Sequence, residues 1–176
     1  RTAFNLLGPL TNPAGANVQV AGAPSVRAAE LMAQTLASLG LFRGYVVHGL
    51  DGLDEITTTT ETLMLEIRGG AIAHNTVVPE DFGIPRAKPE DLKGADRDTN
   101  CEIARSILSG KKGPGRDIVL VNASAALVAS GMVPDFRSGA LKAAESIDSG
   151  AARRILTHLV EFTNNSKRFC FEGVLR

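Results

Sequence analysis

The sequence has few of the features that mark nucleic-acid-binding, membrane or disulfide-rich secreted proteins. It carries 19 Lys and Arg against 19 Asp and Glu, so its formal net charge is +0 at pH 7. This balance gives no reason to expect a nucleic-acid or a membrane partner. No run approaches the ~18 consecutive apolar residues that a membrane helix requires. The two cysteines have no metal-site spacing, and such a Cys-poor, charge-balanced chain favours a reducing cytoplasm over secretion.

The first residues also lack two expected signals. Arg1–Asn5 do not have the basic-then-apolar layout of a signal peptide, and the chain has no initiator Met. We therefore expect it to begin inside a longer protein. Its 176 residues suffice for one domain that buries roughly two-thirds of its unfolded surface.

The first half of the sequence indicates a strand, a helix and a second strand in succession. Residues 18–22 and 45–48 are short apolar runs typical of buried strands. Between them, residues 24–39 have apolar residues at helical spacing, and Gly40 is a natural helix stop. Two strands joined by a helix form a parallel pair. Before this unit, residues 1–15 contain three Gly or Pro turn signals and are predicted to be a loop.

The second half adds an antiparallel hairpin and then mostly helices. Residues 62–67 and 71–78 flank a Gly-Gly turn, which predicts the hairpin, and residues 79–94 read as an irregular loop. Residues 117–121 form a continuous apolar run, as expected of a strand covered on both faces. Helices are predicted over residues 100–109, 123–130, 138–149 and 151–162, and residues 164–176 have no clear period.

These elements predict an α/β fold with a mixed, mainly parallel sheet flanked by helices and an antiparallel hairpin insertion. Only about three strands are available for the parallel part, whereas sheets usually hold ~5–6 strands. We therefore expect further strands upstream of Arg1.

The stretch from Val46 to Glu55 is the most informative part of the chain. An apolar strand runs into a Gly-Leu-Asp-Gly turn that presents two adjacent carboxylates, Asp54 and Glu55. The C-terminal edge of a parallel sheet is where ligands bind in α/β proteins, and Mg²⁺ prefers carboxylate oxygens, water and phosphate. A metal or phosphate site is one interpretation. An ordinary solvent-exposed turn is the other, because Asp and Gly favour turns for local reasons.

Several other polar residues have simple structural interpretations. His48 lies on an apolar strand and is predicted to be a satisfied core or rim histidine. Asn122, between a predicted strand and a predicted helix, is interpreted as a helix cap. The threonines at 57–60 suit an exposed strand or a loop. A solvated turn is predicted for three cations, Lys111, Lys112 and Arg116.

Taken together, five segments resemble the anthranilate phosphoribosyltransferases, which belong to the nucleoside phosphorylase-like glycosyltransferases of family 3. The resemblance extends from Arg1 to about Asn164. It is carried by residues 1–13, 47–56, 79–83, 117–123 and 147–151.

The resemblance implies an enzyme that transfers phosphoribosyl from phosphoribosyl pyrophosphate to the amine of anthranilate and releases pyrophosphate. This is the second step of tryptophan biosynthesis from chorismate. By analogy, Arg1 holds the anthranilate, and Asp54 and Glu55 bind Mg²⁺ with the substrate diphosphate. The resemblance assigns no nucleophilic side chain, and it implies a cytoplasmic homodimer.

The family's remaining parts are not found in this sequence. They are a Gly-rich phosphate loop, a Lys-His-Gly-Asn segment, and the N-terminal helical domain that forms the homodimer interface. The resemblance thus implies that residues 1–163 are the C-terminal part of the large catalytic domain, that residues 164–176 are a tail, and that the fragment is inactive alone. Ala3 and Thr99 are smaller departures from the family pattern.

Two alternatives remain open at this point. A pyrimidine nucleoside phosphorylase-like enzyme shares the expected architecture, although the segments at 1–13 and 79–83 argue against it. A non-catalytic module that binds a partner through an open sheet edge is the other alternative, because exposed edges are prone to pairing.

Overall fold

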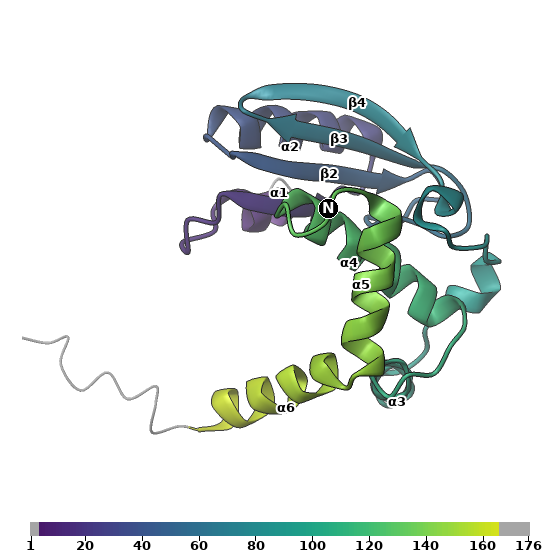
Figure 1. The fold of residues 1–176 in the computed structure, drawn as a ribbon. Helices are drawn as coiled ribbons and strands as arrows, with labels where there is room; N and C mark the ends of the chain where they lie inside the picture. Colours follow the sequence, from purple (N-terminus) through teal and green to yellow (C-terminus); the bar gives the residue numbers. More distant parts are fainter. Residues whose placement is uncertain (1–3, 166–176) are drawn as a thin grey trace, which may run out of the picture.

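The computed structural model describes residues 4–165, with side chains from residue 7 onward. A four-stranded sheet organises the fold, in the order β1 (Val18–Gly22), β2 (Arg43–Gly49), β3 (Thr62–Arg68) and β4 (Ala71–Val77) (Figure 1). β1 and β2 pair in parallel, whereas the β2–β3 and β3–β4 pairs are antiparallel. The mixed sheet is therefore confirmed, but its parallel part within the described residues is a single pair.

One face of the sheet is covered by helix α2 (Val26–Ser38), which begins where the Ser25 hydroxyl accepts a hydrogen bond from the Ala28 amide. Successive residues of a strand point to opposite faces. Val46 therefore joins the cluster that includes Met32 and Leu36 of α2, while its neighbour Val47 joins the cluster beneath the sheet. The β1–α2–β2 unit and the helix stop at Gly40, whose φ is +86°, are as predicted.

The other face is covered by α4 (Pro114–Ala129), and α5 (Phe136–Asp148) packs mainly against α4 (Figure 1). These two helices approach closely at Gly139, where a Cβ would overlap Ser124. The Ser124 hydroxyl donates to the Phe136 carbonyl at 2.6 Å. The Phe136 ring stacks on Phe82 with a centroid distance of 4.8 Å. This layer is held together by small residues, aromatic packing and one buried hydrogen bond.

The remaining elements are shorter or lie at the periphery. They are α1 (Phe4–Leu10), the 3₁₀ turns η1 (Pro79–Phe82) and η2 (Pro89–Leu92), α3 (Arg97–Leu108) and α6 (Ala151–Asn164). Figure 1 shows α6 running out from the end of α5, away from the sheet. No residue of α3 or α6 is buried among the described residues. None of the described helices combines the length and apolar character needed to cross a membrane.

The predicted strand at residues 117–121 is wrong, because this segment belongs to the first half of α4. The helix begins at Gly113, whose φ of +129° suits only glycine, and Pro114 occupies the first turn, where its missing N–H costs nothing. α4 lies between the sheet and other helices and buries Leu120 and Val121. A short apolar run of this kind does not distinguish a covered strand from a covered helix.

The predicted loop at residues 1–15 is wrong in part. Residues 4–10 form α1 although Pro9 lies inside it, and the Thr11 hydroxyl donates to the Leu7 carbonyl at its end. A proline near a helix end removes a single backbone bond, which a short terminal helix tolerates. The turn that follows is as predicted, with the Asn12 carbonyl accepting from the Gly15 amide at 3.2 Å. The antiparallel hairpin is confirmed, with its turn at Gly69 and Gly70.

Candidate metal site at the end of the second strand

The candidate site is built on the loop that connects β2 to β3. Its first turn is closed by the Gly52 amide, which donates to the Gly49 carbonyl at 2.8 Å, and Gly52 has a φ of +98°. The loop then crosses the end of β1, where a Cβ on Gly22 would overlap the Asp54 carbonyl oxygen. Because β1 and β2 are parallel, their C-terminal ends share one edge of the sheet. Asp54 and Glu55 lie at this edge, as predicted.

Asp51 braces the first part of the loop. Its carboxylate accepts from the hydroxyls of Thr57 and Thr59, each at 2.5 Å, and from the Leu53 amide at 3.2 Å. Partial burial raises the pKa of Asp51, but these hydrogen bonds outweigh burial and hold the pKa below its ordinary value. Asp51 therefore stays ionised, and its carboxylate stabilises the loop through these hydrogen bonds.

The threonine run lies in a loop, which is one of the two predicted alternatives, but part of it is buried. Thr57 and Thr58 are buried, and the Thr57 amide donates to the Thr62 hydroxyl at 3.0 Å. The hydroxyls of Thr57 and Thr59 both donate to the Asp51 carboxylate, which ties this part of the loop to its first turn. Sequence periodicity gives no signal of this contact, because it depends on the path of the loop.

Asp54 and Glu55 differ from Asp51, because no donor among the described residues compensates their charge. Within residues 7–165, no hydrogen bond or ion pair joins either carboxylate to another side chain. Partial burial, followed by the adjacent Asp54 charge, raises the pKa of Glu55. Two neighbouring carboxylates without a cationic partner are suited to binding a cation.

The two carboxylates would supply only part of a metal site. No group of three or more His, Cys, Asp or Glu side chains within the described residues is arranged to hold an ion. Mg²⁺ fits such a donor set, because it is usually bound by one or two carboxylates and completes its octahedral shell with water and substrate phosphate. Asp54 and Glu55 are thus the residues that would hold Mg²⁺ here.

Asn122 is a site residue that sequence reasoning misassigned. It lies inside α4 and is not a helix cap. Its side-chain oxygen accepts from the Ile56 amide at 3.0 Å, and its side-chain nitrogen donates to the carbonyls of Ile56 and Ile118 at 2.9 Å each. An Asn inside an apolar helical run is a weak sequence signal for such a contact, because Asn disfavours helix interiors.

Two further polar residues have clear structural roles. His48 is buried, and its Nδ1 donates to the Ala23 carbonyl at 2.9 Å, which confirms a satisfied histidine at the sheet end. Arg116 was predicted to lie in a solvated turn, but its side chain is only 5% exposed. It donates two hydrogen bonds to the Asp148 carboxylate at the end of α5. Arg116 is buried because the helix that replaces the predicted turn and strand points it toward α5.

Glu55 also lies at the rim of a cavity of about 550 Å³ between η2, α3 and the start of α4. The walls of this cavity are mostly apolar and include Leu92, Ile107 and Ile118. Arg1, the third predicted site residue, lies outside the described residues. The structure therefore brings Asp54 and Glu55 together and leaves the Arg1 prediction untested.

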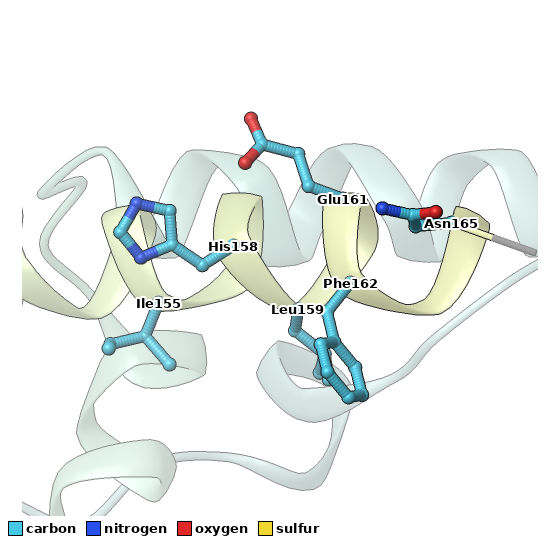
Figure 2. Close-up of a pocket in the computed structure, with 6 residues that line it drawn as sticks. All are labelled: Ile155, His158, Leu159, Glu161, Phe162 and Asn165. Carbon is cyan, nitrogen blue, oxygen red and sulfur yellow. The ribbon is translucent and has the colours of Figure 1, made fainter. Parts of the chain in front are cut away.

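A separate hollow of about 560 Å³ is formed by α6 alone and is shown in Figure 2. Glu161 and Asn165 point to one side of the helix, whereas Ile155 and Leu159 point to the other. This separation marks an amphipathic helix surface. It offers only His158 and Glu161 as metal ligands, so it is not a second metal site.

Comparison with known proteins identifies the class of this fold and site. Residues 1–153 match the glycosyl transferase family, a/b domain. The chain therefore belongs to that glycosyl transferase family.

Its relatives are similar over nearly the whole chain. An anthranilate phosphoribosyltransferase from Solibacter usitatus is 59% identical over 162 residues, which cover 92% of this chain and 48% of the relative. The crystal structure of the anthranilate phosphoribosyltransferase from Thermus thermophilus superposes with a TM-score of 0.83 at 42% identity, over 92% of this chain and 48% of that one. The chain thus spans about half the length of the curated relatives it matches.

The anthranilate phosphoribosyltransferase from Saccharomyces cerevisiae is less similar in sequence but equally similar in structure. Its structure in complex with PRPP and Mg superposes with a TM-score of 0.83 at 28% identity, covering 92% of this chain and 47% of that one. A second structure of the yeast enzyme is in complex with 4-fluoroanthranilate. The names of these proteins favour the anthranilate enzyme over the pyrimidine nucleoside phosphorylase alternative.

Proposed function

We propose that this chain is the C-terminal part of the catalytic domain of an anthranilate phosphoribosyltransferase. The intact protein transfers phosphoribosyl from phosphoribosyl pyrophosphate to anthranilate, the second step of tryptophan biosynthesis from chorismate. Support comes from family membership and from relatives with this name at up to 59% identity. The yeast enzyme's complexes with PRPP and Mg and with 4-fluoroanthranilate support the same two substrates.

The observation that carries the proposal is the pair Asp54 and Glu55. Both carboxylates lie on a braced loop at the C-terminal edge of β1 and β2, and burial, followed by the adjacent Asp54 charge, raises the pKa of Glu55. A diphosphate cannot approach two carboxylates directly, because like charges repel. Mg²⁺ held by Asp54 and Glu55 would neutralise the diphosphate and stabilise the charge that develops on it as it leaves.

The chemistry needs positioning more than a reactive side chain. The anthranilate nitrogen attacks C1 of the ribose, and the new C1–N bond forms as the C1–O bond breaks. The electron pair of the broken bond leaves with pyrophosphate, and the amine loses one proton. Holding both substrates in line supplies much of the rate. In this proposal Arg1 binds the anthranilate carboxylate, for which a guanidinium offers two parallel donors.

The proposed domain arrangement follows the relatives' length. Residues 1–163 belong to the large α/β catalytic domain and residues 164–176 form a tail. The rest of the intact protein supplies the Gly-rich phosphate loop and a helical domain through which it forms a homodimer. The proposed location is the cytoplasm.

The test uses the intact protein and its Asp54→Asn/Glu55→Gln variant. The intact protein is assayed with anthranilate and phosphoribosyl pyrophosphate, and separately for phosphorolysis of uridine and thymidine. We expect transfer to anthranilate without phosphorolysis. The variant keeps side-chain size but loses two anionic ligands, so half-saturation with Mg²⁺ should need at least about tenfold more metal, or ~1.4 kcal/mol. An unchanged Mg²⁺ titration would refute the metal assignment.

A further inference from the structure

Asn122 holds the loop at the residue that directly follows the Asp54–Glu55 pair. The side-chain amide forms hydrogen bonds with both backbone groups of Ile56, at 3.0 Å to its amide and 2.9 Å to its carbonyl. Its second amide hydrogen reaches the Ile118 carbonyl, one helical turn back, at 2.9 Å. Both donors of the side chain are thus used, and the two residues it joins are 66 positions apart.

This contact is more than is needed to pack the loop. The Ile56 side chain is already buried, with 1% exposure, in the core cluster that includes Leu120 and Val121 of α4. Apolar packing alone therefore attaches Ile56 to the helix. The amide adds direction, because two hydrogen bonds to one residue fix the orientation of its peptide groups. The peptide between Glu55 and Ile56 is one of those groups.

The loop is fixed at its other end as well. The Asp51 carboxylate accepts hydrogen bonds from Thr57, Thr59 and Leu53. The Asp54 backbone lies in close contact with Gly22. Between these anchors, Asp54 and Glu55 are adjacent carboxylates of like charge, which repel each other. Repulsion favours conformations that separate them, so presenting both to one ion requires a loop that resists it. Restraint of this kind also lowers the entropy lost on binding.

We infer that Asn122 is a positioning residue, which through the Ile56 backbone sets the direction in which Asp54 and Glu55 are presented to the metal–diphosphate. This inference rests on the proposed function. Asn122 does not contact the substrate; it acts on the loop that carries the two carboxylates. It is therefore the equivalent of a supporting residue around a metal site, whose loss costs about 10- to 100-fold in metal affinity.

The test replaces Asn122 in the intact protein by Ala and, separately, by Ser. Asn122→Ala removes all three hydrogen bonds. Asn122→Ser keeps a bond to the Ile118 carbonyl, because a helical serine donates to the carbonyl four residues back, and removes only the contact with Ile56. The serine variant therefore leaves the helix satisfied if the alanine variant folds poorly. The matched control is Ser124→Ala on the same helix, which removes a buried bond to Phe136 on the side of α5.

Binding of Mg²⁺ with inorganic pyrophosphate is measured by calorimetry, which requires no turnover. The KM values for phosphoribosyl pyrophosphate and for anthranilate are measured in parallel. We expect both Asn122 variants to bind Mg²⁺–pyrophosphate about 10- to 100-fold more weakly. The KM for phosphoribosyl pyrophosphate should rise while the KM for anthranilate stays within about twofold, since only the metal side is displaced. Ser124→Ala should lose thermal stability with Mg²⁺–pyrophosphate affinity unchanged.

A combined variant separates this inference from the proposed function. If Asn122 acts through the two carboxylates, Asn122→Ser adds no further loss of affinity to the Asp54→Asn/Glu55→Gln variant. Equal losses from Asn122→Ser in both backgrounds would overturn the inference, as would an unchanged affinity in Asn122→Ser alone. A carboxylate variant with normal Mg²⁺ affinity would instead overturn the proposed metal site.

Discussion

Two amphipathic helices of this molecule differ in whether their apolar residues are buried. α2 buries Met32 and Leu36 against the sheet, together with Val46 and Leu65 of the strands. α6 has a comparable division into apolar and polar sides, yet Leu159 is 55% exposed and Ile155 is 67% exposed. Within the described residues, Met32 and Leu36 of α2 are buried, whereas Ile155 and Leu159 of α6 are exposed. An apolar helix side is usually a buried one, so we expect Ile155 and Leu159 to be covered in the intact protein.

The comparison distinguishes a region that has its own hydrophobic core from a region, α3 and α6, in which no described residue is buried. The sheet, α2, α4 and α5 enclose two core clusters of their own. In contrast, α3 and α6 enclose a hollow of about 570 Å³ bordered by Ala104, Leu108 and Val160. The candidate site lies at the boundary, because Asp54 and Glu55 belong to the sheet edge while Glu55 also borders the α3 side. In the proposed function, the other half of the intact protein covers this boundary.

The largest expected effect concerns activity. The chain as given should form no measurable phosphoribosyl anthranilate, because two carboxylates cannot replace the backbone donors of a Gly-rich phosphate loop. Activity should return when the remaining part of the intact protein is present in the same chain or added in trans. Product formation is followed by fluorescence or chromatography. Robust turnover by the purified 176-residue chain would show that its candidate site needs no second half.

The next effect contrasts one leucine from each region. Leu65 is fully buried under α2, so Leu65→Ala should lower the free energy of unfolding by about 2–5 kcal/mol. Leu159→Ala in the same chain should change it by less than about 0.5 kcal/mol, because the side chain is already exposed. Urea unfolding followed by circular dichroism measures both. In the intact protein Leu159→Ala should become costly, and a persistently neutral effect would mean that nothing covers α6.

A smaller effect is expected at the joint between the regions, where Arg116 of α4 meets Asp148 just before α6 begins. Hydrogen bonds from Arg116, and then its charge, lower the pKa of Asp148. A lowered carboxyl pKa stabilises the fold above the ordinary pKa of aspartate, and this stability is lost as the pH falls through the folded-state pKa. Asp148→Asn should therefore lower the urea midpoint at pH 7, and the difference from the parent chain should shrink in acid.

The control for the Asp148→Asn variant is Glu145→Gln. Glu145 pairs with Lys142 on the exposed side of α5 at 2.9 Å, with side-chain exposures of 67% and 52%. Exposed pairs contribute little, so its urea midpoint should be nearly unchanged at both pH values. A midpoint shift in Glu145→Gln equal to that in Asp148→Asn would show that burial of Arg116 has no part in the effect.

The smallest expected effect lies at the candidate site itself. Here the substitution should raise the urea midpoint at pH 7, whereas Asp148→Asn should lower it. Burial and then the Asp54 charge raise the pKa of Glu55, so its ionised form opposes folding at neutral pH. Stability from this group therefore increases as the pH falls through the folded-state pKa, and it is complete below the ordinary pKa of glutamate. Glu55→Gln without metal should slightly raise the urea midpoint at pH 7, and the gain should vanish in acid. A lower midpoint at pH 7 would mean that Glu55 has a stabilising partner.

The predictions made from sequence succeeded where the signals are local. The β1–α2–β2 unit, the turn at Gly69 and Gly70, and the position of Asp54 and Glu55 after β2 all follow from turn residues and short-range periodicity. They failed for residues 117–121, because an apolar run is compatible with a covered strand and with a covered helix. That single error also misplaced Asn122 as a cap and Arg116 as a solvated cation.

By itself the sequence determined the sheet-and-helix elements of the first half, the acidic loop and the resemblance to a family, since each depends on neighbouring residues and their spacing. Only the tertiary structure decided that Asn122 holds Ile56 and that Arg116 meets Asp148. The partners lie 66 and 32 positions apart in the chain. They meet because α4 packs between the sheet and α5, and that packing depends on the shape of the whole core.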